Sequence, residues 1–204
     1  MNAKATVFVV DDDPAVRDSL TLLLEEEDLC VASFASAEAF LANCRPPPRS
    51  CAIVDIRMPG MDGMQMQAEL SGRGVLLPVI FLTGHGDIPL SVRAVKAGAV
   101  DFLTKPVTAK ALLESVHAAL LESARLASEA EVNKTAVQCL ATLTERERQV
   151  MALAVAGLHN KEIARHLGIS HRTVEIHKAR IMHKTGANTL LDLARIAEAS
   201  GFLT

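Results

Sequence analysis

Five polar residues stand at or just after the ends of short apolar runs in the first half of the sequence: Asp11, Asp12, Asp55, Thr83 and Lys105. Carboxylates that crowd together repel one another, so a group of three requires a cation. Carboxylate oxygens without His or Cys suit Mg²⁺. Such an ion can hold phosphoryl oxygens while a carboxylate attacks phosphorus, and a lysine and a hydroxyl can bind the remaining oxygens. The residue types therefore predict transient phosphorylation of an aspartate, with Mg²⁺ as the cofactor.

The apolar runs that carry these residues alternate with helical patterns. Strands are expected at 6–10, 30–34, 52–55, 78–82 and 100–103, and helices at 14–27, 37–43, 64–70, 88–97 and from near residue 108 onward. This alternation predicts an α/β fold, with a five-stranded parallel, doubly wound sheet (flavodoxin-like) covered by helices on both faces. Ligands bind beyond the C-terminal ends of the strands in such sheets, which is where the five polar residues fall.

Two other interpretations compete for the acids after the first strand. An acid in this place often caps the following helix, and Asp13 before Pro14 fits that role well. The stretch VVDDDPAV also nearly fits the D-x-D-x-[TV] motif of haloacid-dehalogenase-type phosphatases, with Asp11 as nucleophile and Asp13 as acid. However, the fifth position of that motif is Ala15, and the phosphatase interpretation leaves Asp55 without a role. We therefore expect a phosphoacceptor that is not an enzyme, and steady turnover of a phosphomonoester would favour the phosphatase instead.

Charge divides the chain into an acidic and a basic part. Residues 1–140 carry 12 Lys/Arg and 18 Asp/Glu, whereas residues 141–204 carry 9 and 6, together with five of the seven histidines. A basic part suggests a polyanionic partner, and the absence of Trp and Tyr argues against stacking on single strands. We expect a first domain at 1–120, a helical linker at 121–140 and a smaller all-α domain at 141–204. The linker is either one long helix or a helix that breaks near residues 132–134.

The chain is also expected to be cytoplasmic, with no membrane segment. No apolar run reaches the ~18 residues that span a bilayer, and the apolar stretch at the start is too short for a signal peptide. The four cysteines, Cys30, Cys44, Cys51 and Cys139, form no CxxC pair, and we expect buried free thiols.

The basic part has the pattern of a helix-turn-helix. Thr144 and Glu147 form a T-x-x-E capping box, which predicts a helix from there to about residue 156. Asn160 is expected to cap a short helix that ends near residue 166, and Ser170 a longer one that ends near residue 184. Gly168 provides the turn between them, and a final helix is expected at 189–200. A short helix, a turn with glycine and a longer basic helix are typical of DNA-binding domains.

The longer helix has two distinct faces at 100° per residue. Its inward face is expected to hold Val174, Ile181 and, at the edge of the core, His177. The opposite face, expected in the major groove, holds Arg172, Glu175, Ile176, Ala179 and His183. A carboxylate there can accept a bond from cytosine N4, and apolar side chains can touch a thymine methyl. Phosphate contacts are expected from Lys161, Thr173, Arg180 and Lys184. A helical bundle that binds protein is the alternative.

Longer motifs carry a family resemblance. VFVVDDDPAVRDSL, VDIRMPGMDG, LTGHGD and DFLTKP resemble the signatures of a response-regulator receiver, and the stretch from LTERE to IMHKTGA resembles the LuxR-type helix-turn-helix. Nearly the whole chain is similar to the FixJ branch of the NarL/FixJ family. The resemblance implies that Asp11 and Asp12 assist the metal, that Arg57 offers it a main-chain carbonyl, and that Asp55 takes phosphate from a histidine kinase. One departure is Asp28, where relatives often carry glycine.

The resemblance also implies a switch. Thr83 and Lys105 match the family's hydroxyl and lysine, Phe102 matches its switch aromatic, and the bond before Pro106 is expected to be cis. His85, inside TGHGD, is expected to shape its loop rather than to transfer phosphate. Phosphorylation is then expected to produce a homodimer that binds double-stranded promoter DNA and regulates transcription.

Overall fold

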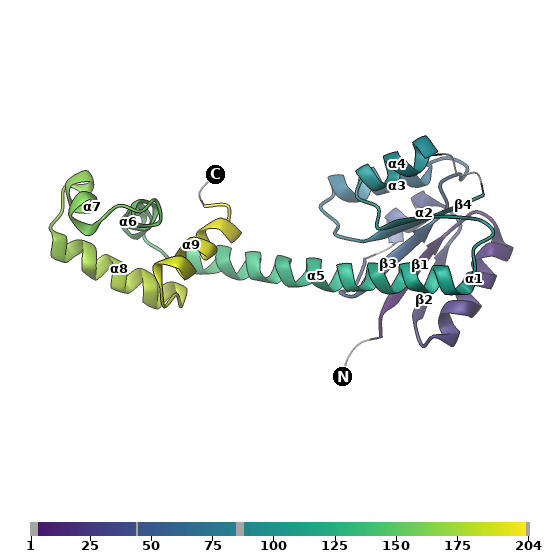
Figure 1. Cartoon of the computed structure of the whole chain (residues 1–204), viewed down its shortest axis with the longest axis horizontal. Coiled ribbons are helices and arrows are strands. Elements are labelled where there is room, and N and C mark those ends of the chain that lie inside the picture. The colour runs from purple at the N-terminus through teal and green to yellow at the C-terminus, as the bar shows by residue number, and fades with distance from the viewer. Residues whose placement is uncertain (1–3, 44, 85–87, 203–204) are drawn as a thin grey trace. The chain divides into compact units, whose positions relative to one another are not determined.

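A computed structural model describes residues 4–43, 45–84 and 88–202 (Figure 1). The chain folds as two compact units, residues 1–127 and 128–204. Within the described ranges, no helix has the length and apolar content that a membrane span requires.

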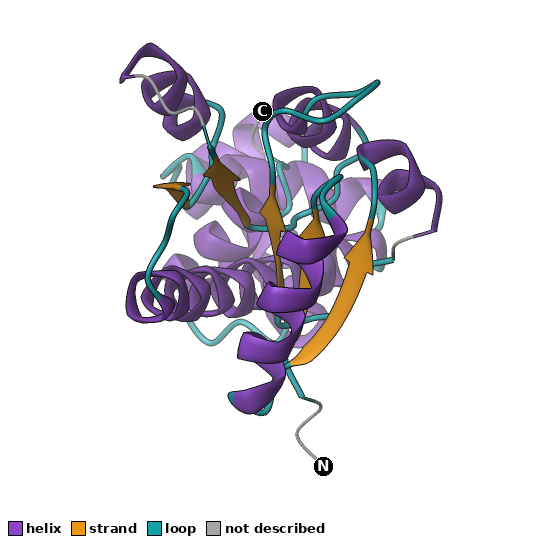
Figure 2. Cartoon of the chain, turned by 90° about the vertical axis from the view of Figure 1, so that its right-hand side faces the viewer, coloured by secondary structure: helices purple, strands orange, loops and turns teal. Residues whose placement is uncertain are grey.

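The first unit is a five-stranded parallel sheet with helices between its strands (orange and purple in Figure 2). The strands are β1 (Thr6–Val10), β2 (Cys30–Phe34), β3 (Ser50–Val54), β4 (Val79–Thr83) and β5 (Asp101–Thr104). The helices are α1 (Pro14–Glu26), α2 (Ala37–Asn43), α3 (Gly63–Gly72), α4 (Ile88–Lys96) and α5 (Ala109–Ala141). The strand order is β2-β1-β3-β4-β5, so the chain adds β2 on one side of β1 and the later strands on the other side. Doubly wound sheets bind ligands at this switch point between β1 and β3.

Alternate residues of the strands feed two cores, one on each face of the sheet. Phe8 and Val54 face α2, α3 and α4, and lie in a core with Phe40 and Met66. Val7, on the opposite face, lies in a core with residues of α1 and α5. Because both faces are covered, the strands consist of nearly continuous apolar residues, as the sequence predicted.

Most predicted elements are confirmed to within one or two residues. The peptide bond before Pro106 is cis, as expected. Asp28 has a φ of 60°, a left-handed conformation that explains why glycine suits this position. The expectation of buried thiols is confirmed for Cys51 but wrong for Cys30, which is exposed on the edge strand β2, and only partly met by Cys139, which is half-buried. Cys44 lies outside the described residues.

The second unit is helical, with α6 (Glu145–Val155), α7 (Asn160–Leu167), α8 (His171–Thr185) and α9 (Leu190–Ala199). The capping box of Thr144 and Glu147 is present, and Ser170 caps α8 as predicted. The cap of α7 is His159 rather than Asn160, because the Glu162 carboxylate binds the amide of His159. Helix α5 is continuous to Ala141, so the break considered near residues 132–134 does not occur.

Candidate functional site

The sheet topology brings the predicted acidic residues together. Strands β1 and β3 are neighbours, with Val10 paired to Val54, so the residues that follow them emerge side by side. The amide of Asp55 continues the ladder by donating to the Val10 carbonyl at 2.8 Å. Asp11 is 2% exposed, Asp55 is 9% exposed and Asp12 is exposed to solvent. Two buried carboxylates and one exposed carboxylate thus meet at this edge of the sheet.

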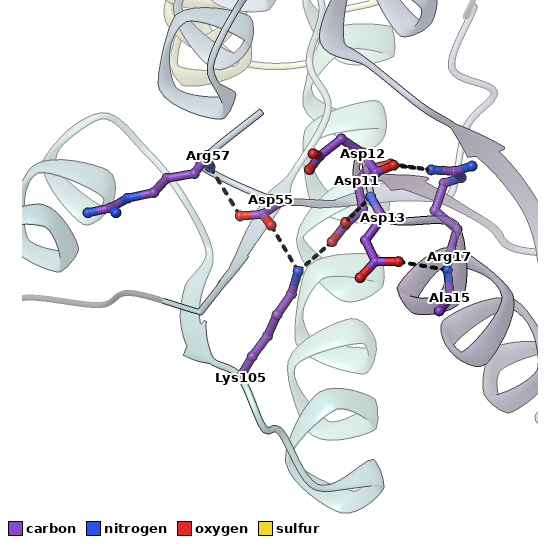
Figure 3. Close-up of polar contacts among 8 residues, drawn as sticks. All are labelled: Asp11, Asp12, Asp13, Ala15, Arg17, Asp55, Arg57 and Lys105. Atoms are coloured by element: carbon purple, nitrogen blue, oxygen red, sulfur yellow. Dashed lines mark hydrogen bonds and ion pairs between the residues drawn. The ribbon is translucent and has the colours of Figure 1, made fainter. Parts of the chain in front are cut away.

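One lysine connects the two buried carboxylates (Figure 3). The Lys105 ammonium donates to Asp11 Oδ2 at 2.6 Å and to Asp55 Oδ2 at 2.9 Å. Lys105 reaches them because β5 lies beside β4, and its own amide binds the Thr83 carbonyl at 2.8 Å. The other oxygen of Asp55 accepts the amide of Arg57 at 3.1 Å, while the Arg57 side chain points away from the acids.

Burial and ion pairing have opposite effects on the pKa values of Asp11 and Lys105. Burial raises the pKa of Asp11 above its usual value, although the bond from Lys105 acts in the opposite direction. Burial alone would lower the pKa of Lys105, but its bonds to Asp11 and Asp55 outweigh burial and raise that pKa. The lysine therefore stays charged, and its ammonium is shared between two of the three carboxylates.

The loop after β3 requires a glycine at the start of α3. A Cβ atom on Gly63 would lie 2.5 Å from the main-chain oxygen of Asp55, which is closer than any side chain tolerates. Asp62 caps α3 by accepting the amide of Gln65 at 2.7 Å. The turn RMPGMDG therefore combines capping with a close approach to the main chain of Asp55, and the Gly63 amide also binds the Ile56 carbonyl at 3.0 Å.

The loop after β1 is held by bonds that the sequence did not fully predict. Asp13 caps α1 by accepting the amide of Ala15 at 2.9 Å, as predicted, and this favours a capping role over a catalytic one. Arg17 donates from one nitrogen to the carbonyls of Asp11 and Asp12 (Figure 3). The only signal in the sequence was its place one turn after Asp13, which puts it on the side of α1 that faces this loop.

The second unit presents one face of α8 to solvent. Val174 and Ile181 are fully buried in its core, as predicted. His177 is half-buried, and its Nδ1 is buried with no hydrogen bond to any part of the chain that the structure describes. The residues predicted to read DNA or contact its phosphates are exposed at Arg172, Glu175, Ile176, Ala179 and Arg180 on α8 and at Lys161 on α7.

Two of the predicted phosphate contacts are engaged inside the unit. The Lys184 ammonium binds Glu147 Oε2 at 2.7 Å and the Thr142 carbonyl at 3.1 Å. The Thr173 hydroxyl lies 2.8 Å from that of Ser170, within the cap of α8. We therefore assign Lys184 and Thr173 to the internal structure of the unit before any role on DNA.

Comparison with known families settles what these two units are. Residues 7–117 match the response regulator receiver domain, and residues 141–197 match the bacterial regulatory proteins of the luxR family. The transcriptional regulatory protein FixJ of Azorhizobium caulinodans is 46% identical over 195 residues, which cover 96% of this chain and 92% of that protein. The chain belongs to the FixJ-type response regulators.

Other members of this group resemble the chain over comparable lengths. Nodulation protein W of Bradyrhizobium diazoefficiens is 44% identical and is matched over 98% of this chain and 88% of its own. Among solved structures, the response regulator StyR superposes with a TM-score of 0.80 at 42% identity, covering 96% of this chain and 99% of its own. Full-length FixJ from B. japonicum gives 0.59 at 40% identity, with both chains fully covered.

The two residues expected to form a switch, Thr83 and Phe102, lie on the neighbouring strands β4 and β5. Thr83 is fully buried at the end of β4. It lies two residues after Phe81, which pairs with Val54 of β3. Phe102 on β5 is half-buried and packs against the core beneath α4. His85 lies outside the described residues.

The donor set fits the Mg²⁺ that receivers generally bind. Asp11, Asp12 and Asp55 each offer a carboxylate oxygen, and these oxygens lie within 4.8 Å of one another. Hard oxygen donors with excess negative charge are what this ion requires, and Mg²⁺ commonly binds through one or two carboxylates while keeping several waters. Asp12 is exposed, so one of the three carboxylates is in contact with solvent.

Proposed function

We propose that Asp55 is the phosphoacceptor and that phosphorylation controls binding of promoter DNA. The observation that supports this most strongly is the surroundings of Asp55. Its carboxylate is bonded by Lys105 and by the Arg57 amide, and it lies at the switch point of the sheet, beside two further acids. Fixed hydrogen-bond donors directed at a reacting group are the usual source of stabilisation in phosphoryl transfer.

The proposed reaction transfers phosphate from a histidine kinase. An oxygen of Asp55 forms a bond to phosphorus as the bond between phosphorus and the kinase histidine nitrogen breaks, and the histidine leaves with the bonding electron pair. When bound by Asp11, Asp12, Asp55 and the Arg57 carbonyl, Mg²⁺ would neutralise charge on the phosphoryl oxygens. Lys105 exchanges its bond to Asp55 for one to a phosphoryl oxygen.

The proposed switch uses the residues on β4 and β5. The Thr83 hydroxyl binds another phosphoryl oxygen, and Phe102 follows it inward. Helix α4 packs against β5 and exposes Val92 and Val95, which are 46% and 58% exposed. An apolar face beside the switch suits a homodimer that forms on phosphorylation, because a bond available in only one state shifts the equilibrium toward that state.

The exposed face of α8 is proposed to enter the major groove. Glu175 accepts a bond from cytosine, and Ile176 and Ala179 contact thymine methyl groups, while Arg172 lies on the same face. Lys161 and Arg180 contact phosphates, which position the unit without reading sequence. Glu175→Ala should then relax preference at one base per half-site by about 1–3 kcal/mol and leave affinity for random duplex nearly unchanged.

Intact-mass measurement tests the phosphoacceptor. With Mg²⁺ and acetyl phosphate, the wild-type chain should gain one phosphoryl group and Asp55→Asn should gain none. Equal labelling of the two proteins would remove Asp55 from its role. Continued release of inorganic phosphate from a simple phosphomonoester, without labelling, would indicate the phosphatase interpretation instead.

A further inference from the structure

The main chain of the acidic loop is held by one side chain from α1. Nη1 of Arg17 donates to the Asp11 carbonyl at 2.7 Å and to the Asp12 carbonyl at 3.0 Å (Figure 3). These two residues supply two of the three carboxylates that surround the proposed metal position. Arg17 itself is half-buried. Its guanidinium thus binds the backbone from which both carboxylates project.

The two aspartates differ in what else holds them. Asp11 also accepts the Asp13 amide at 3.0 Å and the ammonium of Lys105. For Asp12, the bond from Arg17 to its carbonyl is the one hydrogen bond or ion pair recorded anywhere in the described ranges. An exposed carboxylate close to two others is pushed outward by like-charge repulsion. The position of Asp12 near the group therefore depends on the anchor that Arg17 provides.

We propose that Arg17 is a positioning residue for the metal site, which keeps the Asp12 carboxylate within reach of an ion shared with Asp11 and Asp55. The inference rests on the proposed function, since it needs Mg²⁺ to bind there. Groups behind metal ligands commonly change metal affinity by about 10–100-fold when they are removed, because they orient the ligands that touch the ion.

A competing effect makes the sign of the result informative. Arg17 is a cation near the site, and a nearby positive charge opposes binding of another cation. If charge dominated, Arg17→Met would bind Mg²⁺ more tightly than wild type. If positioning dominates, the same variant binds it more weakly. Arg17→Lys keeps the charge but has a shorter side chain with a single nitrogen. Its affinity for Mg²⁺ should therefore lie between those of wild type and Arg17→Met.

The test is isothermal titration of the full chain with Mg²⁺ alone, because the sequence has no Trp or Tyr to report binding. We expect the dissociation constant to rise about tenfold in Arg17→Met. Arg45→Met is the control, since Arg45 is exposed in the loop before β3, at the opposite edge of the sheet. Labelling of Asp55 by acetyl phosphate should need correspondingly more Mg²⁺ but reach a wild-type rate at saturation.

The outcomes separate the inference from the function on which it rests. Wild type that neither binds Mg²⁺ nor becomes labelled would end the proposed function. Wild type that does both, with Arg17→Met binding Mg²⁺ equally or more tightly, would overturn the positioning role. A lower saturating rate with unchanged Mg²⁺ affinity would overturn it too, because Arg17 would then act on the reacting groups. Should Arg17→Met fail to fold, Arg17→Lys decides, and wild-type affinity in that variant overturns the proposal.

Discussion

Each unit of the chain contains a lysine bonded to buried carboxylate, and the two groups differ in charge balance. In the first unit, Lys105 faces Asp11 and Asp55, with Asp12 close by. In the second, Lys184 pairs with a single carboxylate, that of Glu147, among the described residues, and the amide of Thr144 binds the same carboxylate. The bond from Lys184, followed by the one from Thr144, lowers the pKa of Glu147 to about 2.

Ion-pair geometry alone does not distinguish a phosphorylation site from a structural pair. Glu147 is 3% exposed and matched one-to-one by its lysine, so its charge is fully compensated. At the first group, burial raises the pKa of Asp11 even with Lys105 beside it, and the nearby charge of Asp55 acts in the same direction. Excess negative charge can attract Mg²⁺, which in turn can hold a phosphoryl group. The Lys184–Glu147 pair has no such excess and links α8 to α6.

The largest expected effect is on the rate at which Asp55 is phosphorylated when Lys105 is replaced. Lys105→Met should slow phosphoryl transfer to Asp55 by about 100-fold at saturating Mg²⁺, because it removes a donor aimed at the phosphoryl oxygens. The initial rate of mass gain with acetyl phosphate measures this. Lys110→Met is the matched control, since Lys110 is exposed and only 4.0 Å from Glu114. Labelling of Lys105→Met at the wild-type rate would show that Lys105, like Lys184, has only a structural role.

The second lysine should affect stability and leave labelling unchanged. Lys184→Met leaves the buried Glu147 carboxylate without its cation and should destabilise the second unit by about 2 kcal/mol. Amide hydrogen exchange in α6 and α8 measures the loss. Lys134→Met, at an exposed lysine 3.7 Å from Glu131, should change protection very little. Unchanged protection in Lys184→Met would show that the pair contributes nothing to the fold.

Acid should affect the balanced pair in a defined range of pH. The folded pKa of Glu147 is about 2, below its ordinary value of 4.5. Its stabilisation is therefore fully present above 4.5 and is lost as pH falls from 4.5 toward 2. The protection of α6 amides against hydrogen exchange should fall more steeply over this range in wild type than in Glu147→Gln. Asp192, whose pKa is lowered by its bonds to Thr189, should leave a residual slope in both proteins. Identical slopes would contradict the account.

The smallest expected effect concerns DNA. Arg180→Ala should lower the slope of log affinity against log salt by about one unit, because it removes a phosphate contact. Lys184→Met should leave that slope unchanged, because its ammonium is already paired inside the unit. Binding titrations with random duplex at several salt concentrations measure both. A slope lowered in Lys184→Met but unchanged in Arg180→Ala would reverse the two assignments.

The sequence was sufficient to place residues at strand ends and at the caps of α6 and α8. Lys105 and Asp55 are far apart in sequence, yet a parallel sheet must bring the ends of its strands to one edge. The spacing of Thr144 and Glu147 alone predicted the start of α6. Other contacts depend on packing between helices that no local pattern specifies. Helical periodicity placed Lys184 among the polar residues of α8, but only the packing of α6 against α8 directs it to Glu147.

The same limit applies to the loop after β1. Periodicity could place Arg17 on one side of α1, but its bonds go to main-chain oxygens, which have no sequence signature. The cap of α7 moved from Asn160 to His159 because a carboxylate one turn later binds the His159 amide, and this outweighs the usual preference for Asn at a cap.

The central claim is that phosphorylation of the first unit governs DNA binding by the second. The direct test is a binding titration with a duplex selected from random-sequence DNA by the phosphorylated chain. Wild type and Asp55→Asn are each measured with and without acetyl phosphate and Mg²⁺. The account predicts that phosphodonor raises wild-type affinity by about tenfold or more and leaves Asp55→Asn unchanged. Full labelling of wild type with no gain in affinity, or an equal gain in Asp55→Asn, would contradict it.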